Sequence, residues 1–248
     1  MYPILGRYGP FFFYTYSAVM GLGLLAALGL MAWQERRQLA AAGWQNSLLL
    51  ALPAGLIGGR LAYVAANWPY FQAHPAERWF VWRGGLSYHG AVLTGLLVLA
   101  LWAWRNGRSP ASYAGRLAPA AALWSTCGWL ACWFEGCAYG RETFIGPLSA
   151  DLPDSYGVFA VRYQTQLLGM ALSLATLALL WRLRHLQPAS SFWLALFLLS
   201  AGRFLVSFFR GDAVPVLAGV RLDTILDGAL AGSALAAIGL RRLVARDR

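Results

Sequence analysis

The chain has 248 residues, of which 59% are hydrophobic and only 12% are charged, and its mean hydropathy is +0.52. A soluble domain of this length would carry about twice that share of charged residues, so the composition excludes an ordinary soluble protein and indicates an integral membrane protein. The net charge of +10 could suggest nucleic acid, but the arginines flank apolar segments and form no basic stripe, and we expect no nucleic-acid partner.

Seven apolar segments approach or reach the roughly 20 residues that a bilayer-spanning helix needs. In chain order, the predicted spans are Phe12–Trp33, Asn46–Ala66, Gly90–Trp104, Leu117–Trp133, Gln166–Trp181, Phe192–Phe209 and Leu222–Leu240. We therefore expect an all-α, polytopic membrane protein with about seven transmembrane helices, folded as one domain over residues 1–248.

Arginine clusters orient these spans. They follow the first, third, fifth and seventh segments, at residues 36–37, 105–116, 182–184 and 241–248. Because cytoplasmic loops carry an excess of basic residues, we expect the N-terminus outside and the C-terminus in the cytoplasm. The two longest connections, residues 67–88 and 141–163, then lie on the outer side. The first of them is rich in aromatic residues, which predicts an amphipathic segment along the membrane interface.

The three cysteines, Cys127, Cys132 and Cys137, recur at intervals of five residues. On a continuous helix this spacing spreads the thiols around the axis, so packing as small apolar side chains is favoured over a disulfide or a metal site. We expect neither a metal nor a cofactor.

Two arginines lie within apolar spans, where a charge is costly and calls for a partner or a function. Arg203 lies in the middle of the sixth span, and Arg60 follows a pair of glycines near the outer end of the second. A lipid phosphate is an abundant membrane anion that either arginine could bind. Two alternatives stay open: Arg60 extends to the interface, or Arg203 pairs internally with Glu135, Asp223 or Asp227.

His89 precedes the third predicted span and follows two paired glycines, Gly84 and Gly85. Glycines allow a close approach of the backbone to a ligand, and histidine readily takes up a proton near neutral pH. This pattern predicts a general base. An interfacial histidine that only packs or caps a helix is the open alternative.

The densest polar cluster interrupts the end of the fourth span, between Gly128 and Arg141, and contains Glu135 and Gly140. Irregular backbone at membrane depth is tolerated only where it is buried in protein or lines a cavity, so this segment is expected to line a pocket. A glycine-packed helix end, with Arg141 at the interface, is the alternative.

Four stretches, in order along nearly the whole chain, resemble the bacterial prolipoprotein diacylglyceryl transferase family. They are Gly58-Gly-Arg60-Leu-Ala-Tyr63, Gly84-Gly-Leu-Ser-Tyr-His89-Gly90, Glu135-Gly-Cys-Ala-Tyr-Gly140-Arg141 and Gly202-Arg203-Phe-Leu-Val-Ser-Phe-Phe-Arg210. The resemblance implies a seven-span, multi-pass enzyme of the bacterial inner (cytoplasmic) membrane. Such an enzyme transfers the diacylglyceryl group of phosphatidylglycerol to the lipobox cysteine of a prolipoprotein signal peptide, and forms a thioether and glycerol-1-phosphate.

The resemblance also implies roles for single residues. His89 matches the family's essential histidine, proposed to help deprotonate the thiol, and Arg203 matches an essential arginine. Glu135 is expected to assist His89 in catalysis. The expected substrate-binding residues are Tyr16, Arg60, Gly140, Arg141, Gln166 and Arg210.

The chain departs from the family pattern at four positions near this machinery. Trp129 stands where the family signature has an arginine, and Glu135 where it has an asparagine. Gly169 and Ser207 stand where the family has glutamates. These departures keep an alternative open, a catalytically inactive paralogue that acts as a phospholipid-binding membrane protein. A transporter is not favoured, because the sequence shows neither inverted repeats nor ionisable residues in successive spans.

Overall fold

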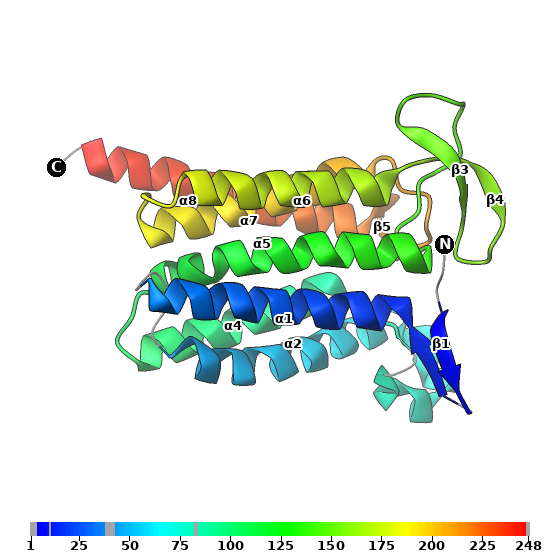
Figure 1. Ribbon diagram of the computed structural model, residues 1–248, viewed down its shortest axis with the longest axis horizontal. Coiled ribbons are helices and arrows are strands. Elements are labelled where there is room, and N and C mark those ends of the chain that lie inside the picture. The colour runs from blue at the N-terminus through cyan, green and yellow to red at the C-terminus, as the bar shows by residue number, and fades with distance from the viewer. Residues whose placement is uncertain (1–3, 10, 38–42, 82–83, 247–248) are drawn as a thin grey trace.

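The computed structural model describes residues 4–9, 11–37, 43–81 and 84–246, and it is mainly helical (Figure 1). Its seven long helices are α1 (Thr15–Arg36), α2 (Trp44–Ala66), α4 (Tyr88–Arg105), α5 (Pro110–Glu135), α6 (Thr165–Arg182), α7 (Pro188–Ser207) and α8 (Leu222–Arg246). Each predicted span corresponds to one of them, although α5 begins and α8 ends several residues beyond the predicted limits. The start of the first span at Phe12 is wrong, because Phe12 to Tyr14 belong to a strand and α1 begins at Thr15. The prediction of an all-α membrane protein is confirmed. Trp82 and Arg83 of the outer segment, and Arg248 of the last arginine cluster, lie outside the described residues.

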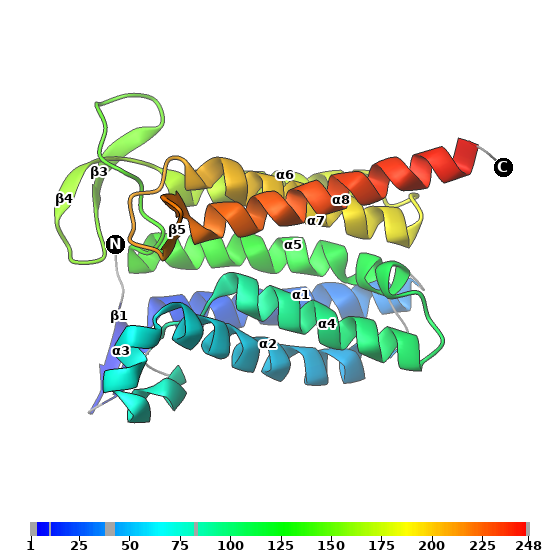
Figure 2. The ribbon, with the colours of Figure 1, turned by 180° about the vertical axis from the view of Figure 1, so that it is seen from behind.

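Within the described part of the chain, six helices are long and apolar enough to cross a membrane: α1, α2, α5, α6, α7 and the stretch Leu222–Leu243 of α8. Helix α4 has 18 residues and starts with two polar ones, Tyr88 and His89. It runs alongside α2 in the bundle (Figure 2). Its status as a seventh span therefore stays a prediction.

Helix α5 is the centre of the bundle. It packs against α1 and α4 on one side and against α6 and α7 on the other, while α2 packs on α4 and α8 packs on α7 (Figures 1 and 2). Small residues make much of its buried surface, including Gly115, Ala118, Ala120, Ala122 and Ala131. Because lipid tails are as apolar as leucine, helices in a membrane gain most from close backbone packing, which small residues permit.

Glycines set the close approach of α4 to α2. A Cβ atom on Gly90 would lie 2.6 Å from the carbonyl oxygen of Gly58, closer than any side chain tolerates. A Cβ atom on Gly58 would collide with the side chain of Thr94. The glycines of two sequence motifs thus meet across one interface, which fixes the helix start that carries His89.

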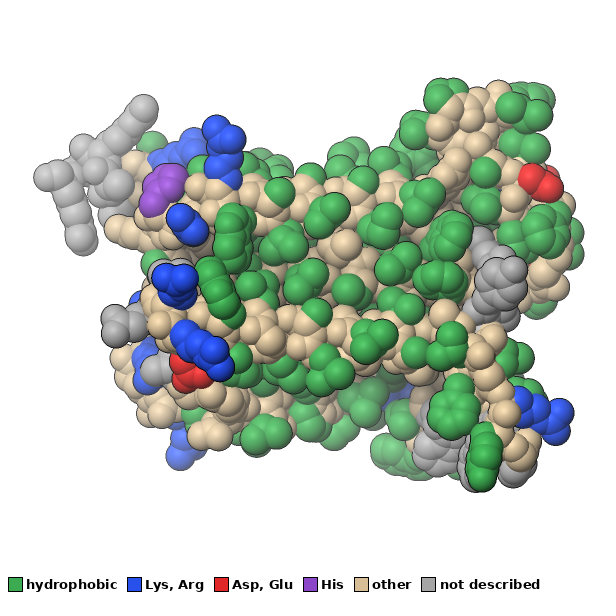
Figure 3. Space-filling model, in the orientation of Figure 1, with side chains coloured by type: hydrophobic (Ala, Val, Ile, Leu, Met, Phe, Trp, Pro, Cys, Tyr) green, Lys and Arg blue, Asp and Glu red, His purple; other side chains and the backbone are tan. Residues whose placement is uncertain are grey.

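The bundle has two unlike ends. Helices α1, α4, α6 and α8 run toward the same end, which we call the arginine end because most basic side chains gather there (Figure 3). Its described arginines are Arg36, Arg37, Arg105, Arg108, Arg116, Arg182, Arg184, Arg241 and Arg242. The positive-inside rule assigns this end to the cytoplasm. That orientation stays a prediction.

The opposite end, which we call the hairpin end, carries short elements that the sequence did not reveal. Three antiparallel hairpins pair β1 (Ile4–Tyr8) with β2 (Phe11–Tyr14), β3 (Ser149–Pro153) with β4 (Phe159–Tyr163), and β5 (Val216–Leu217) with β6 (Val220–Arg221). A short helix α3 (Trp68–Ala73) and the 3-10 turn η1 (Pro75–Trp79) fill the predicted amphipathic segment. Residues 141–163, expected as a plain connection, contain the β3–β4 hairpin.

We predict that Gly90→Ala lowers the free energy of unfolding by about 1–3 kcal/mol, because the new methyl group forces α4 away from α2. Gly95→Ala on the same helix is the matched control, since its methyl group would lie 3.7 Å from the Ala51 carbonyl oxygen, an ordinary contact. This control is expected to be neutral or stabilising by up to about 1 kcal/mol. Thermal unfolding of the two purified variants in detergent makes the comparison, and equal melting temperatures would contradict the close helix packing.

Candidate functional site

Three ionisable side chains from three helices meet inside the bundle near the hairpin end. They are His89 on α4, Arg203 on α7 and Asp227 on α8. His89 Nε2 lies 2.9 Å from Asp227 Oδ1, and Arg203 Nε lies 3.5 Å from the same oxygen. His89 and Asp227 are almost fully buried, at 5% and 1% exposure. Buried charges in an apolar bundle persist only when they are paired, and here one carboxylate serves two partners.

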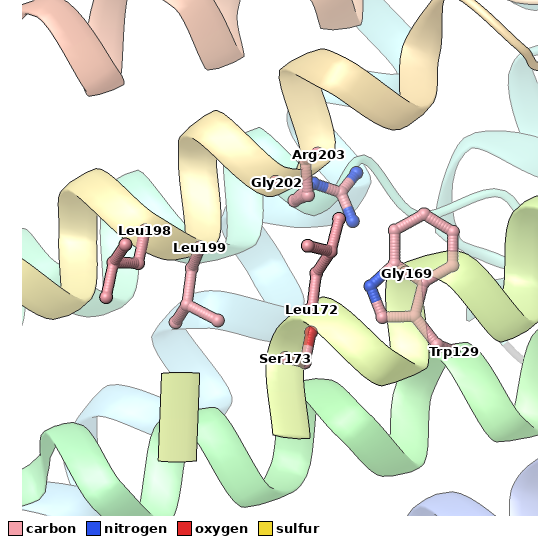
Figure 4. A pocket seen from close by; sticks show the side chains of 8 residues that line it. All are labelled: Trp129, Gly169, Leu172, Ser173, Leu198, Leu199, Gly202 and Arg203. Atoms are coloured by element: carbon pink, nitrogen blue, oxygen red, sulfur yellow. The ribbon is translucent and has the colours of Figure 1, made fainter. Parts of the chain in front are cut away.

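Two aromatic rings enclose the guanidinium of Arg203. Its Cζ atom lies 3.6 Å from the ring centroid of Tyr88 and 5.5 Å from that of Trp129. Figure 4 shows Arg203 and the Trp129 indole in one small pocket, whose other lining residues are Gly169, Leu172, Ser173, Leu198, Leu199 and Gly202. Cation–π contacts of this kind contribute up to about 2 kcal/mol when the cation is desolvated, so the rings offset part of the cost of burying Arg203.

Arg203 keeps donors free. Its Nε atom, although ion-paired with Asp227, has no hydrogen bond within the described part of the chain, and its two terminal nitrogens donate to no described residue. A guanidinium carries five N–H donors in a fork that fits a carboxylate or phosphate in bidentate fashion. With a side chain 16% exposed, Arg203 can therefore bind an anion that reaches it.

Arg60 is committed to the loop that leads to His89. Its guanidinium donates to four backbone carbonyl groups, those of Glu77, Arg78, Gly84 and Gly85. Both glycines have positive φ, at 81° and 73°, a conformation that glycine adopts without strain. Arg60 is 6% exposed, so protein carbonyl groups surround its guanidinium; the alternative in which it extends to the membrane interface stays a prediction. Its predicted direct contact with substrate stays a prediction.

Arg210 belongs to a second charge network, at the hairpin ends of α7 and α8. It forms ion pairs with Asp212 and Asp223, and Arg221 pairs with the same two acids. Burial by itself lowers the pKa of Arg210, but the bond and attraction to Asp212 outweigh it, so the pKa is raised. The network ties the two helices that carry Arg203 and Asp227. It also resolves the sequence alternatives, because Asp223 pairs with Arg210 while Asp227 pairs with Arg203.

Cys132 and Cys137 form a disulfide, so the prediction of unpaired cysteines is wrong for this pair. The spacing argument assumed a continuous helix, but α5 ends at Glu135, where Gly136 takes a left-handed φ of 81°. The chain turns back there and brings the two cysteine Cα atoms within 4.7 Å, inside the range that a disulfide spans. Cys127, within α5, is free.

The segment after this turn packs on the chain that follows α7. Gly140 forms an isolated bridge with Arg210. The Arg141 N–H donates to the Phe209 carbonyl oxygen over 2.8 Å. A Cβ atom on Gly140 would collide with the backbone of Tyr163, which explains why only glycine fits. The broken end of α5 thus packs closely against other parts of the protein, and the prediction that it lines a pocket stays a prediction.

Gln166 holds the same segment from the other side. Its side chain, 1% exposed, donates to the Cys137 carbonyl oxygen over 3.0 Å, and Thr165 donates to that of Ala138 over 2.7 Å. Both residues begin α6. Their contacts are with protein backbone, so a role for Gln166 in binding substrate directly stays a prediction.

Three predicted site residues lie apart from the His89–Asp227–Arg203 cluster, since none of the described contacts joins them to it. Glu135 is exposed at the end of α5, and Tyr16 is half-buried in the first turn of α1. Arg141 is exposed, and its Cζ atom lies 5.7 Å from the ring centroid of Tyr163. The alternative in which Glu135 is the ion-pair partner of Arg203 is wrong.

An apolar pocket lies beside Arg141. It has a volume of about 220 Å³ and is lined by Pro147, Leu148, Tyr163, Gln164, Thr165, Leu167, Leu168, Ala171 and Phe209. The lining is suited to part of a hydrocarbon chain, because its surface is mainly apolar.

The sequence analysis did not anticipate the enclosing rings. Tyr88 appeared there only as a neighbour of His89, and Trp129 only as a departure from a motif. Asp227 was named only as one of three possible partners. The usable signal was that Asp227 is an ionisable residue inside an apolar span, which by itself indicates a functional or paired group.

Comparisons with known proteins identify a family that the chain matches over most of its length. The family model for prolipoprotein diacylglyceryl transferase matches residues 3–241. The phosphatidylglycerol–prolipoprotein diacylglyceryl transferase of Paenarthrobacter aurescens is 29% identical over 239 residues, which cover 87% of this chain and 75% of the relative. The protein of that name from Rhodococcus jostii is 31% identical over 242 residues, which cover 87% of this chain and 67% of the relative. The protein of that name from Streptococcus equi subsp. equi is 30% identical over 140 residues, which cover 56% of this chain and 54% of the relative.

We predict that denatured but unreduced protein reacts with one maleimide per chain, at Cys127, and that reduced protein reacts with three. Intact-mass spectrometry counts the adducts. Cys127→Ser is the control and should remove the single adduct of the unreduced sample. Three adducts without reductant, on protein extracted under conditions that block thiol exchange, would rule out the disulfide.

Proposed function

Because the chain belongs to the prolipoprotein diacylglyceryl transferase family, we propose that it transfers the diacylglyceryl group of phosphatidylglycerol to a cysteine thiol of a prolipoprotein. The observation that carries this proposal is the buried cluster in which His89, a base, lies beside Arg203, a cation with free donors, around one carboxylate oxygen. The reaction needs both a proton acceptor and a site that stabilises a phosphate leaving group.

In the proposed reaction, the thiol proton passes to His89, because the thiolate is the nucleophile. The thiolate sulfur attacks the carbon of the diacylglyceryl group that bears the phosphate ester, and forms the C–S bond of a thioether. The bond between that carbon and the phosphate oxygen breaks, and its electron pair stays on the oxygen. The proton on His89 then leaves to the released glycerol-1-phosphate or to solvent, which restores the neutral imidazole.

Arg203 stabilises the leaving group. Negative charge grows on the phosphate as the carbon–oxygen bond breaks, and a fixed guanidinium in a water-poor site acts strongly on such charge. Arg141, exposed at the hairpin end, is a second cation that can attract the headgroup. The apolar pocket beside Arg141 fits part of an acyl chain.

The remaining expected site residues support the substrate by building its surroundings. Arg60 holds the loop before His89, while Arg210 joins α7 to α8. Gly140 and Gln166 fix the segment that follows α5. We propose that Tyr16 and Glu135, which lie on the same end of the bundle, contact the headgroup or the acceptor peptide.

The proposed location is the bacterial inner membrane, with the hairpin end on its outer face. The arginine clusters support this orientation. The disulfide at the hairpin end supports it independently, since disulfides persist on the oxidising side of that membrane and are rare in the cytoplasm. The proposed partners are phosphatidylglycerol, the bilayer, and prolipoprotein signal peptides with a lipobox cysteine.

One observation favours the alternative of a catalytically inactive, phospholipid-binding paralogue. Trp129 occupies a place where the family pattern has an arginine, and its ring lies directly against Gly169. Trp129 therefore leaves the pocket one cation short of the family pattern, and no side chain fits on Gly169 beneath the indole, where the pattern has a glutamate. The transferase is the better supported of the two, because His89 and Arg203 keep the base and the anion site.

We predict that purified protein, given phosphatidylglycerol and a lipobox peptide in detergent, adds a diacylglyceryl mass to the peptide and releases glycerol phosphate. Arg203→Ala and His89→Gln are each expected to slow turnover by on the order of 10²–10⁴-fold, through loss of charge stabilisation or of the base. Arg184→Ala, an exposed arginine at the arginine end, is the control and should leave the rate unchanged.

Full activity of a well-folded His89→Gln protein would contradict its role as the base. A folded wild-type protein that transfers nothing, beside an active relative in the same assay, would favour the phospholipid-binding paralogue.

A further inference from the structure

We propose that Asp227 is a positioning residue of the transfer reaction: its carboxylate accepts the Nε2 proton of His89 and thereby aims the basic Nδ1 atom at the acceptor thiol. The part of this inference that concerns turnover rests on the proposed function. The part that concerns the tautomer of His89 does not depend on that function.

The tautomer follows from the contact. An ionised carboxylate can only accept hydrogen bonds, and His89 Nε2 lies 2.9 Å from Asp227 Oδ1. The proton of the neutral imidazole is therefore on Nε2, and the lone pair is on Nδ1. Nδ1 makes no hydrogen bond to the described residues, so it is left available as the base. Histidine bases in enzymes are commonly held this way, with one nitrogen bound to an orienting group and the other facing the substrate.

Cationic side chains lie close to the Asp227 carboxylate. Arg203 Nε lies 3.5 Å from the same carboxylate oxygen, and the positive charge of Arg210 also acts on Asp227. A carboxylate that is 1% exposed would be strongly disfavoured without such partners. The acid thus has a cation on one side and the imidazole on the other.

The ring of His89 is fixed on a second side by Tyr88. The two rings meet edge to face, with centroids 5.3 Å apart and planes at 87°. Tyr88 also stacks on Arg203, whose Cζ atom lies 3.6 Å from its centroid. Rotation of the imidazole would therefore disturb both its contact with the Tyr88 ring and its contact with Asp227. These contacts together fix the orientation of Nδ1.

The positions where the family pattern has glutamates are neutral here, and neutral contacts fill them. Ser207 accepts a hydrogen bond from the Thr224 hydroxyl over 2.8 Å, and Gly169 lies under the Trp129 ring. Among the described residues, Asp227 is then the one carboxylate that pairs with Arg203. The acid of this site therefore comes from α8, whereas the two positions where the family pattern has glutamates lie on α6 and α7.

Three variants test the proposal. Asp227→Asn keeps the shape but loses the charge, and its amide can donate to Nε2 and so favour the opposite tautomer. Asp227→Glu keeps the charge and the acceptor. Asp151→Asn is the matched control, because it makes the same exchange at an exposed acid of β3 that no described contact joins to His89 or Arg203.

The first readout is nitrogen NMR of protein labelled with ¹⁵N-histidine. The chain has three histidines, and the signal that disappears in His89→Gln identifies His89. We expect the Nε2-protonated tautomer of His89 in the wild-type protein and in Asp151→Asn, and a loss of that tautomer in Asp227→Asn. An Nδ1-protonated His89 in the wild-type protein would overturn the proposal whether or not the protein is active.

The second readout is the split of kcat from KM in the transfer assay. Asp227→Asn is expected to lower kcat on the order of 10²–10⁴-fold, as expected for loss of a tautomer-fixing carboxylate, with KM for phosphatidylglycerol changed less than about threefold. Asp227→Glu should recover part of kcat. A folded Asp227→Asn protein with wild-type kcat would overturn the positioning role, and so would a loss confined to KM.

Failures of the two proposals remain distinguishable. Wild-type protein without transfer activity contradicts the proposed function, yet its His89 tautomer still decides the Asp227 contact. If Asp227→Asn does not fold, the wild-type tautomer together with the activity of Asp227→Glu decides: a folded Asp227→Glu protein with no recovered activity counts against the proposal.

Discussion

Arg203 places a guanidinium charge inside an apolar helix bundle. The side chains around it at the hairpin end offset the free-energy cost of burying that charge. An unpaired cation in such an apolar place costs about several kcal/mol, so it needs a nearby anion and polarisable side chains around it. Asp227 supplies the anion from the neighbouring helix, and the faces of Tyr88 and Trp129 are the polarisable surroundings. What makes the site chemically useful is that this support leaves the terminal nitrogens of Arg203 without an acceptor among the described residues.

The rest of the structure positions these groups. Glycines of α2 and α4 bring the two helices close, and Arg60 binds the carbonyl groups of the loop before His89. The Arg210 network joins α7 to α8, which keeps Arg203 and Asp227 in register. Helix α5, packed between the two halves of the bundle, places Trp129 against Gly169 and ends in the disulfide-bonded turn. Two arginines that looked alike in sequence, Arg60 and Arg203, thus have different tasks, one structural and one open to an anion.

Sequence reasoning found the helices because transmembrane segments are long, apolar and flanked by arginine, and these are properties of local composition. It found His89 and Arg203 because polar groups in apolar spans are conspicuous. It could not find the contact between His89 and Asp227, which are 138 residues apart and meet only because of helix rotations that no local pattern specifies. It missed the disulfide because the helix ends at Glu135. It missed the hairpins because their strands, two to five residues long, are too short to show an alternating pattern.

The central claim is that the free donors of Arg203 are the phosphate site of the reaction. An experimental structure with bound phosphatidylglycerol tests it most directly. The account predicts phosphate oxygens within hydrogen-bonding distance of the Arg203 terminal nitrogens, with the ester-bearing glycerol carbon on the side of His89 Nδ1. A phosphate held instead at the exposed Arg141, with Arg203 bound only to Asp227 and the two rings, would contradict it.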